Sequence, residues 1–159
     1  MQGAAMTAKI DAFDRKILKC LQTEPQLSMV DLAERVGLSH TPCWRRLRRM
    51  ENAGLIMGRP VILNPVALGY PVNVFANIKI RNHDEAILEQ FEDVVRGHAE
   101  IVECFSMSGD SDYVLRIVAR SIEDYERFLK KVLLHLPGVG SINSSFSLKQ
   151  VKMTTAIPI

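Results

Sequence analysis

A dense group of cationic side chains lies between residues 44 and 49, where the chain reads Trp-Arg-Arg-Leu-Arg-Arg and carries its only tryptophan. Arginine presents a planar fork of donors that can grip a phosphate, or the O6/N7 edge of guanine, with two parallel hydrogen bonds. A face that only keeps a helix soluble usually mixes both signs of charge, because like charges at helical spacing repel one another. The run therefore indicates a polyanionic partner, and an ordinary solvated face is the alternative.

Helical spacing divides this stretch into a buried stripe and an exposed face. At about 100° per residue, Cys43, Leu47 and Met50 fall on one line and form the expected core contact. Arg46 lies nearer the edge of the core, where its head group can pair locally. The opposite face and its flanks carry Thr41, Trp44, Arg45, Arg48, Arg49 and Asn52.

Three short helices are expected between residues 11 and 54. Asp11, Ser28 and Ser39 each stand where an N-cap is needed, and Gly37 permits a left-handed turn between the second and third helices. This is the order of a helix-turn-helix, whose last helix enters the major groove near its N-terminal end.

We therefore predict DNA contacts from one set of third-helix residues, with Trp44 packing against the following joint as an alternative for that residue. Thr41, Trp44 and Arg45 are assigned to base edges or the groove, and Arg48, Arg49 and the Ser39 cap to phosphates.

The period of the hydrophobic pattern changes after residue 71. Alternating segments near 72–81, 101–107, 113–119 and 141–151 predict strands, and helical spacing predicts helices between the first pair and between the last pair. The resulting βαββαβ order predicts an α+β chain with an N-terminal helix-turn-helix domain of winged-helix-like type and a C-terminal ferredoxin-like domain. The expected divisions are an extension at 1–9, the DNA-binding domain at 10–60, a hinge at 61–71 and the second domain at 72–159. The tail at 152–159 is expected to add a fifth strand.

Composition and charge restrict the remaining possibilities. Residues 1–60 carry ten Lys and Arg against six Asp and Glu, whereas residues 61–159 carry ten against twelve. A basic front half is consistent with a polyanionic partner.

No apolar run approaches the ~20 residues of a membrane span, so we expect a cytoplasmic protein. The three cysteines show no paired spacing, which favours buried free thiols over disulfides or zinc.

The turn Ser-Gly-Asp-Ser-Asp at residues 108–112 permits three interpretations. Gly109 can supply a positive φ while the aspartates bond nearby amides, which is ordinary turn chemistry. Paired carboxylates could instead catalyse or bind a metal, but the four histidines, His40, His83, His98 and His135, fall in no ligand spacing. The third interpretation is a pocket for the ammonium and carboxylate of an amino acid.

Several ordered motifs resemble the Lrp/AsnC "feast/famine" transcriptional regulators over residues 10–159. They are the segment 27–56, Leu63-Asn-Pro65, the Gly-Asp-Ser-Asp-Tyr turn at 109–113, Leu136-Pro-Gly-Val139 and Thr154-Thr-Ala-Ile-Pro158. The chain departs from the family at Arg59, where an aromatic residue is usual, and at His40, where proline is common. The resemblance implies a homodimer that assembles to an octamer, no cofactor, and an amino-acid effector. It also implies effector contacts from Gly109, Asp110, Asp112, Tyr113, Thr154 and Thr155.

Three functions are weighed on these observations. The first is a sequence-specific, double-stranded-DNA-binding transcriptional regulator that responds to a small amino acid. The second is an architectural oligomer that compacts DNA with little sequence preference and no obligatory ligand. The third is an enzyme, which we set aside because no nucleophile–base pair, phosphate loop or metal set is recognisable. Alternate strand residues such as Val74, Ile78, Leu115 and Phe146 are expected to be too apolar to leave both sheet faces in water, which favours sheet-to-sheet pairing.

Overall fold

The computed structural model describes residues 9–159, which form two compact units. The first unit contains the chain up to Val61 and the tail Lys152–Ile159, and the second contains Ile62–Val151. The expected extension at 1–9 lies outside the described residues except for Lys9. Among the described helices, none combines the length and the apolar character that crossing a membrane would need.

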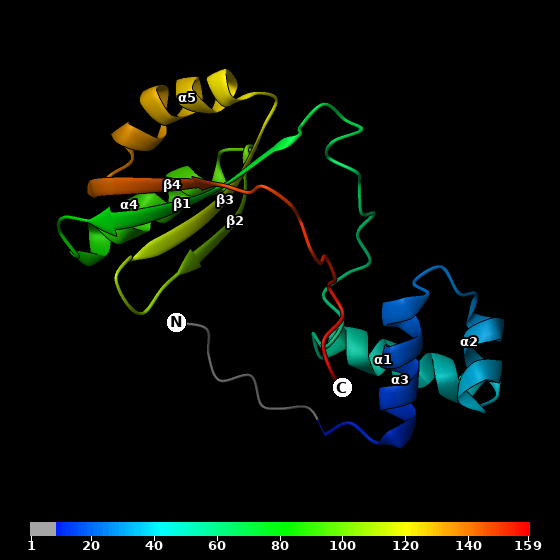
Figure 1. Ribbon diagram of the computed structural model, residues 1–159. Coiled ribbons are helices and arrows are strands. Elements are labelled where there is room, and N and C mark those ends of the chain that lie inside the picture. The colour runs from blue at the N-terminus through cyan, green and yellow to red at the C-terminus, as the bar shows by residue number, and fades with distance from the viewer. Residues whose placement is uncertain (1–8) are drawn as a thin grey trace. The chain divides into compact units, whose positions relative to one another are not determined.

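The first unit is built from three helices. They are α1 (Ala12–Thr23), α2 (Met29–Val36) and α3 (His40–Asn52), labelled in Figure 1. Asp11 caps α1 by accepting the Asp14 amide, and Ser28 caps α2 by accepting the Asp31 amide. These two predicted caps are confirmed.

The turn and the core of this unit follow the predicted pattern. Gly37 ends α2 at φ 75°, in the left-handed region that favours glycine, and so redirects the chain into α3. Cys43, Leu47 and Met50 of α3 are buried against residues of the other two helices. The remaining buried apolar residues of this core are Ile17, Leu32, Ala33 and Val36. Because the stripe is buried, the arginine-rich side of α3 faces solvent.

The second unit is a four-stranded antiparallel sheet with two helices. The strands are β1 (Val72–Ile80), β2 (Ile101–Ser106), β3 (Tyr113–Ala119) and β4 (Val139–Phe146), in the order β2-β3-β1-β4 (Figure 1). The helices are α4 (Glu85–Arg96) and α5 (Ile122–Lys131), followed by the 3-10 turn η1 (Leu133–His135). The predicted α+β fold with βαββαβ order is confirmed.

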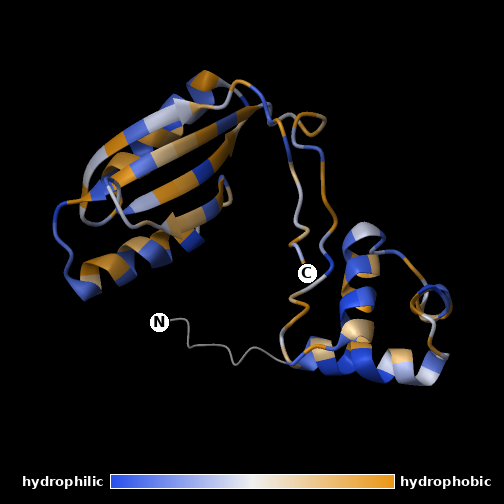
Figure 2. Cartoon of the chain, turned by 60° about the horizontal axis from the view of Figure 1, so that its bottom comes forward, coloured by the Kyte–Doolittle hydropathy of each residue, from blue (hydrophilic) through white to orange (hydrophobic). Residues whose placement is uncertain are grey.

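Hydrophobic and hydrophilic residues alternate along the strands (Figure 2), and three of the four apolar residues named from the sequence lie on the face that the helices cover. Val74, Ile78 and Leu115 are fully buried on the face that packs against Phe91 of α4 and Tyr125 of α5. The apolar residues of the other face are different ones, such as Phe75, 38% exposed, and Phe105, 56% exposed. Alternation alone shows that two faces differ but not which face the helices cover.

Two further predictions were wrong. Residues 152–159 form no strand; this tail groups with the helical unit, where both the Gln22 amide nitrogen and oxygen hydrogen-bond to the backbone of Ile157. Of the three expected buried thiols only Cys43 is buried, since Cys20 is partly exposed and Cys104 is exposed.

Candidate nucleic-acid interface and effector turn

The solvent side of α3 presents a tryptophan and two arginines that are free of buried partners. Trp44 is 45% exposed, and the Arg48 guanidinium carbon lies 5.8 Å from the centre of its ring. Arg48 also pairs with Glu51 one turn later, at 3.1 Å on the helix surface. No ion pair or side-chain hydrogen bond within the described part of the chain involves Arg45. Arg45 and Arg48 can therefore reach an external anion at little cost, because an exposed pair is weak.

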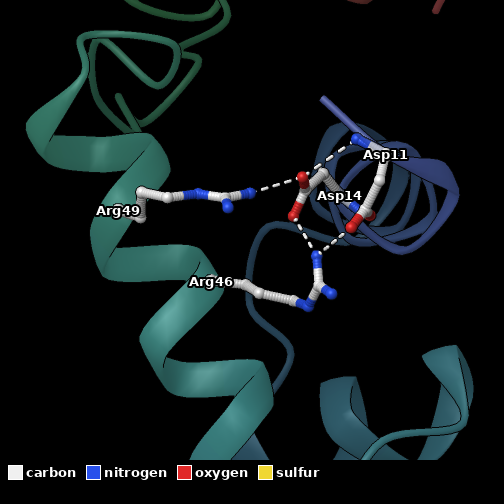
Figure 3. A network of polar contacts seen from close by, with 4 residues as sticks. All are labelled: Asp11, Asp14, Arg46 and Arg49. Atoms are coloured by element: carbon white, nitrogen blue, oxygen red, sulfur yellow. Dashed lines mark hydrogen bonds and ion pairs between the residues drawn. The ribbon is translucent and has the colours of Figure 1, made fainter. Parts of the chain in front are cut away.

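The other two arginines are bound to carboxylates of α1 (Figure 3). The Arg46 Nη1 donates to Asp14 Oδ1 at 2.9 Å and to Asp11 Oδ2 at 2.5 Å. The Arg49 Nη2 donates to Asp14 Oδ2 at 2.5 Å. The local pairing expected of Arg46 is confirmed, whereas Arg49, assigned to phosphates from its position on α3, holds a carboxylate of its own chain.

Asp14 is the centre of this group, and its side chain is only 1% exposed. Asp11 joins it because each residue's backbone N–H donates to the other's carboxylate, at 2.9 and 3.0 Å. The bond from the Asp14 amide, and then the Arg46 guanidinium, lower the pKa of Asp11. The two carboxylates in turn raise the pKa of Arg46. Two acids and two arginines thus form a charge-balanced clamp between α1 and α3.

The N-terminus of α3 differs from the prediction in one bond. Ser39 occupies the N-cap position, but its side chain makes no capping hydrogen bond. In α1 and α2 the cap accepts the amide of the third helical residue, and in α3 that residue is Pro42, which has no N–H. The Ser39 hydroxyl and the first free amides of α3 are consequently open to an external acceptor such as a phosphate.

The turn at residues 108–112 of the second unit, where effector contacts are expected, contains an aspartate that is hydrogen-bonded within the chain. Asp112 Oδ2 accepts the Ile80 amide at 2.7 Å, and Asp112 Oδ1 lies 2.8 Å from His83 Nε2. The Ile80 bond, and then His83, lower the pKa of Asp112. Gly109 has φ 136°, as the turn interpretation requires. For Asp112, the backbone bond expected of ordinary turn chemistry is present.

The other residues expected to bind an effector lie in different environments. Asp110 is exposed, whereas the Tyr113 ring is buried and packs 4.5 Å from the ring of Phe91. The Tyr113 hydroxyl donates to Glu92, and burial with this bond raises its pKa to about 12. The Tyr113 side chain therefore packs within the core of its unit. Thr154 and Thr155 are exposed in the tail, which groups with the other unit.

Two residues of these sites were not found from the sequence. Neither Asp14 nor His83 was assigned a role from the sequence. Both contacts join residues about thirty positions apart, so no local spacing reveals them. Within residues 9–159 no group of three or more His, Cys, Asp or Glu side chains could hold a metal ion.

A helix-turn-helix unit with an exposed arginine-bearing third helix, joined to an α+β unit, defines the class of DNA-binding regulators. Residues 10–57 match the family described as winged helix-turn-helix DNA-binding, and residues 73–157 match the Lrp/AsnC ligand binding domain. The chain belongs to the Lrp/AsnC family of transcriptional regulators.

Individual relatives match over nearly the full chain. The DNA-binding transcriptional activator DecR of Escherichia coli K12 is 36% identical over 150 residues, which cover 94% of this chain and 99% of that protein. The leucine-responsive regulatory protein of Haemophilus influenzae is 38% identical over 145 residues, covering 91% and 87%. A crystal structure of a Neisseria meningitidis transcriptional regulator with L-methionine superposes with a TM-score of 0.89 at 35% identity, covering 94% and 97%.

Proposed function

We propose that this protein regulates transcription by binding duplex DNA through α3 and that a small amino acid modulates its assembly or its binding. The observation that carries the DNA-binding part is the exposed side of α3, where Arg45 has no partner among the described residues and Arg48 has only a surface one. Thr41 and Trp44 flank these arginines at the end of α3 that enters the groove in helix-turn-helix proteins. We propose no catalytic step. We expect the protein in the cytoplasm, where its DNA target lies.

The two arginines have separate roles in this proposal. Arg45 lies within the first two turns of α3 and is assigned to a base edge or the groove. Arg48 lies one turn later and is assigned to a phosphate, which it can reach by exchanging Glu51 for the anion. Ser39 is assigned to a second phosphate, because its hydroxyl is not used as a cap. Arg49 is assigned to a phosphate as well, through the donors that Asp14 leaves free.

Replacement of Arg45 and Arg48 by alanine tests the DNA-binding part. Binding of a fluorescent mixed-sequence duplex is measured by anisotropy over a range of salt concentrations. We expect Arg48→Ala to reduce the salt slope by about one and the double variant to weaken binding by tenfold or more. Arg127→Ala, which removes an exposed arginine from α5, is the control and should bind as the wild type does. Full affinity in the double variant would remove the assignment.

The amino-acid part is supported by the relative that carries L-methionine in its structure and by the match to the ligand binding domain. We assign effector contacts to Gly109, Asp110 and Asp112 of the turn and, as the family resemblance implies, to Thr154 and Thr155 of a second copy across a subunit boundary. Since Tyr113 is buried, its contribution is the backbone that follows the turn.

A thermal-shift screen of the twenty amino acids, with L-methionine and L-leucine first, tests the effector assignment. A ligand that prefers the folded state raises the melting temperature. Asp110→Ala should reduce the shift without lowering the melting temperature of the free protein, because Asp110 is exposed. No shift with any amino acid would contradict the effector assignment.

We also propose that two copies of the chain associate through their sheets. Phe75 and Phe105 expose aromatic surface on the face of the sheet opposite α4 and α5, and burial of such surface favours pairing of two copies. The further assembly of four dimers into an octamer rests on the family resemblance. Light-scattering molar masses test both steps, and a monomer at micromolar concentration would contradict them.

A further inference from the structure

We infer that Asp14 is a positioning residue of the DNA-binding surface, which holds the guanidinium of Arg49 in place on α3 for a phosphate of the duplex. This inference rests on the proposed DNA-binding function and assigns a role to a residue that lies on α1, outside the recognition helix. Asp14 does not meet DNA itself, because its side chain is 1% exposed.

The geometry leaves Arg49 both held and accessible. Its Nη2 donates to Asp14 Oδ2 at 2.5 Å, yet its side chain is 56% exposed. A guanidinium has five N–H donors in a rigid fork, so one bond to Asp14 leaves donors for a second acceptor. An arginine whose side chain is already ordered loses less conformational freedom when it grips a phosphate.

The negative charge of the buried Asp14 carboxylate is already compensated without Arg49. Arg46 already donates to Asp14 Oδ1 at 2.9 Å, and the Asp11 amide donates to Asp14 Oδ2 at 3.0 Å. Arg46 is the more buried of the two arginines, at 27% exposed against 56% for Arg49. Arg46 therefore pairs with Asp14 on the buried side of the clamp. The bond from Arg49 to Asp14 holds the Arg49 guanidinium at the surface.

Arg45 and Arg48 are not held in this way. Arg48 pairs with Glu51 on its own helix, 60% exposed, and that pair orients it only relative to α3. The Asp14 contact ties Arg49 to α1 as well, so the phosphate contact of Arg49 would depend on how α1 and α3 pack. A substitution at Asp14 should thus alter DNA binding through Arg49 and through no other arginine of the exposed face.

A double-mutant cycle tests this dependence with the full chain and the same fluorescent duplex. Affinity is measured for the wild type, Asp14→Asn, Arg49→Ala and the double variant. We expect Asp14→Asn to weaken binding about fivefold when Arg49 is present and less than twofold when Arg49 is alanine, since a held side chain loses less entropy. The salt slope should fall by about one in Arg49→Ala and stay unchanged in Asp14→Asn.

Two results would overturn the inference. An equal loss of affinity in both backgrounds would show that Asp14 acts only through the stability of the unit. A rise in affinity and in salt slope for Asp14→Asn would show that Asp14 withholds Arg49 from DNA. Asp93→Asn, which removes the acid of an exposed pair with Arg96 on α4, is the control and should leave binding unchanged.

Arg49→Lys keeps the test decisive if Asp14→Asn does not fold. Lysine retains the charge for a phosphate but lacks the planar fork, so the salt slope should remain and the affinity should fall between those of the wild type and Arg49→Ala. Wild-type affinity in Arg49→Lys would contradict the inference. Because Arg45 and Arg48 are outside this cycle, the proposed function and the role of Asp14 can fail separately.

Discussion

The carboxylate of Asp112 is held from two sides by its own chain. One oxygen accepts the Ile80 amide at the end of β1, and the other lies within hydrogen-bond distance of His83 in the loop before α4. The sequence indicated the turn and its glycine, but not these partners, which lie 32 and 29 residues away. The bonds join the turn after β2 to the end of β1, so Asp112 stabilises the place where the effector is proposed to bind.

Asp112→Asn is expected to lose stability in a pH-dependent way. Because the pKa of Asp112 is lowered in the folded state, first by the Ile80 bond and then by His83, its ionised form favours folding. That contribution is complete above the ordinary aspartate pKa of about 3.9 and is lost as the pH falls through the lower folded value. Thermal unfolding should therefore show a lower Tm for Asp112→Asn at pH near 7 and a difference that narrows below about pH 4. Asp110→Asn is the exposed control, and a difference that is constant with pH would contradict this account.

At the scale of helices and strands, local chemistry predicted most boundaries. Asp11 and Ser28 cap α1 and α2 as expected, and Ser121 caps α5 in the same way, each accepting an amide three residues on. Ser39 failed as a cap because the residue three positions on is Pro42. A proline at that position has no N–H to donate to the Ser39 side chain, and this can be seen in the sequence. The sheet order and the covered face depend on long-range packing, which periodicity does not contain.

The same contrast between caps predicts effects of different size for two serine substitutions in one unit. Ser28→Ala removes the bond to the Asp31 amide at 3.1 Å and should lower the free energy of unfolding by about 1 kcal/mol. Ser39→Ala removes no such bond and should change it by less than about 0.5 kcal/mol. Urea unfolding followed by the fluorescence of Trp44, the only tryptophan, reports on this unit. Equal losses for both variants would show that Ser39 caps α3 in solution.

At the scale of the whole molecule, the sequence predicted two units of different architecture and the family to which they belong. The contact between the tail and Gln22 joins residues 135 positions apart, so no local pattern in the sequence indicates it. Two of the four arginines also proved to be bound by α1, so the exposed positive charge of α3 is smaller than the sequence suggested. The regulator account accordingly rests on Arg45 and Arg48, with Arg49 held at their side by Asp14.

Photo-crosslinking from α3 to duplex DNA tests this account most directly. A benzophenone amino acid placed at Thr41, which is exposed in the first turn of α3, should crosslink to bases of a bound duplex, and the yield should fall as salt is raised. The same amino acid at Arg127 on α5 should give no crosslink. Crosslinks from position 127 and none from position 41 would show that DNA binds elsewhere and would contradict the central claim.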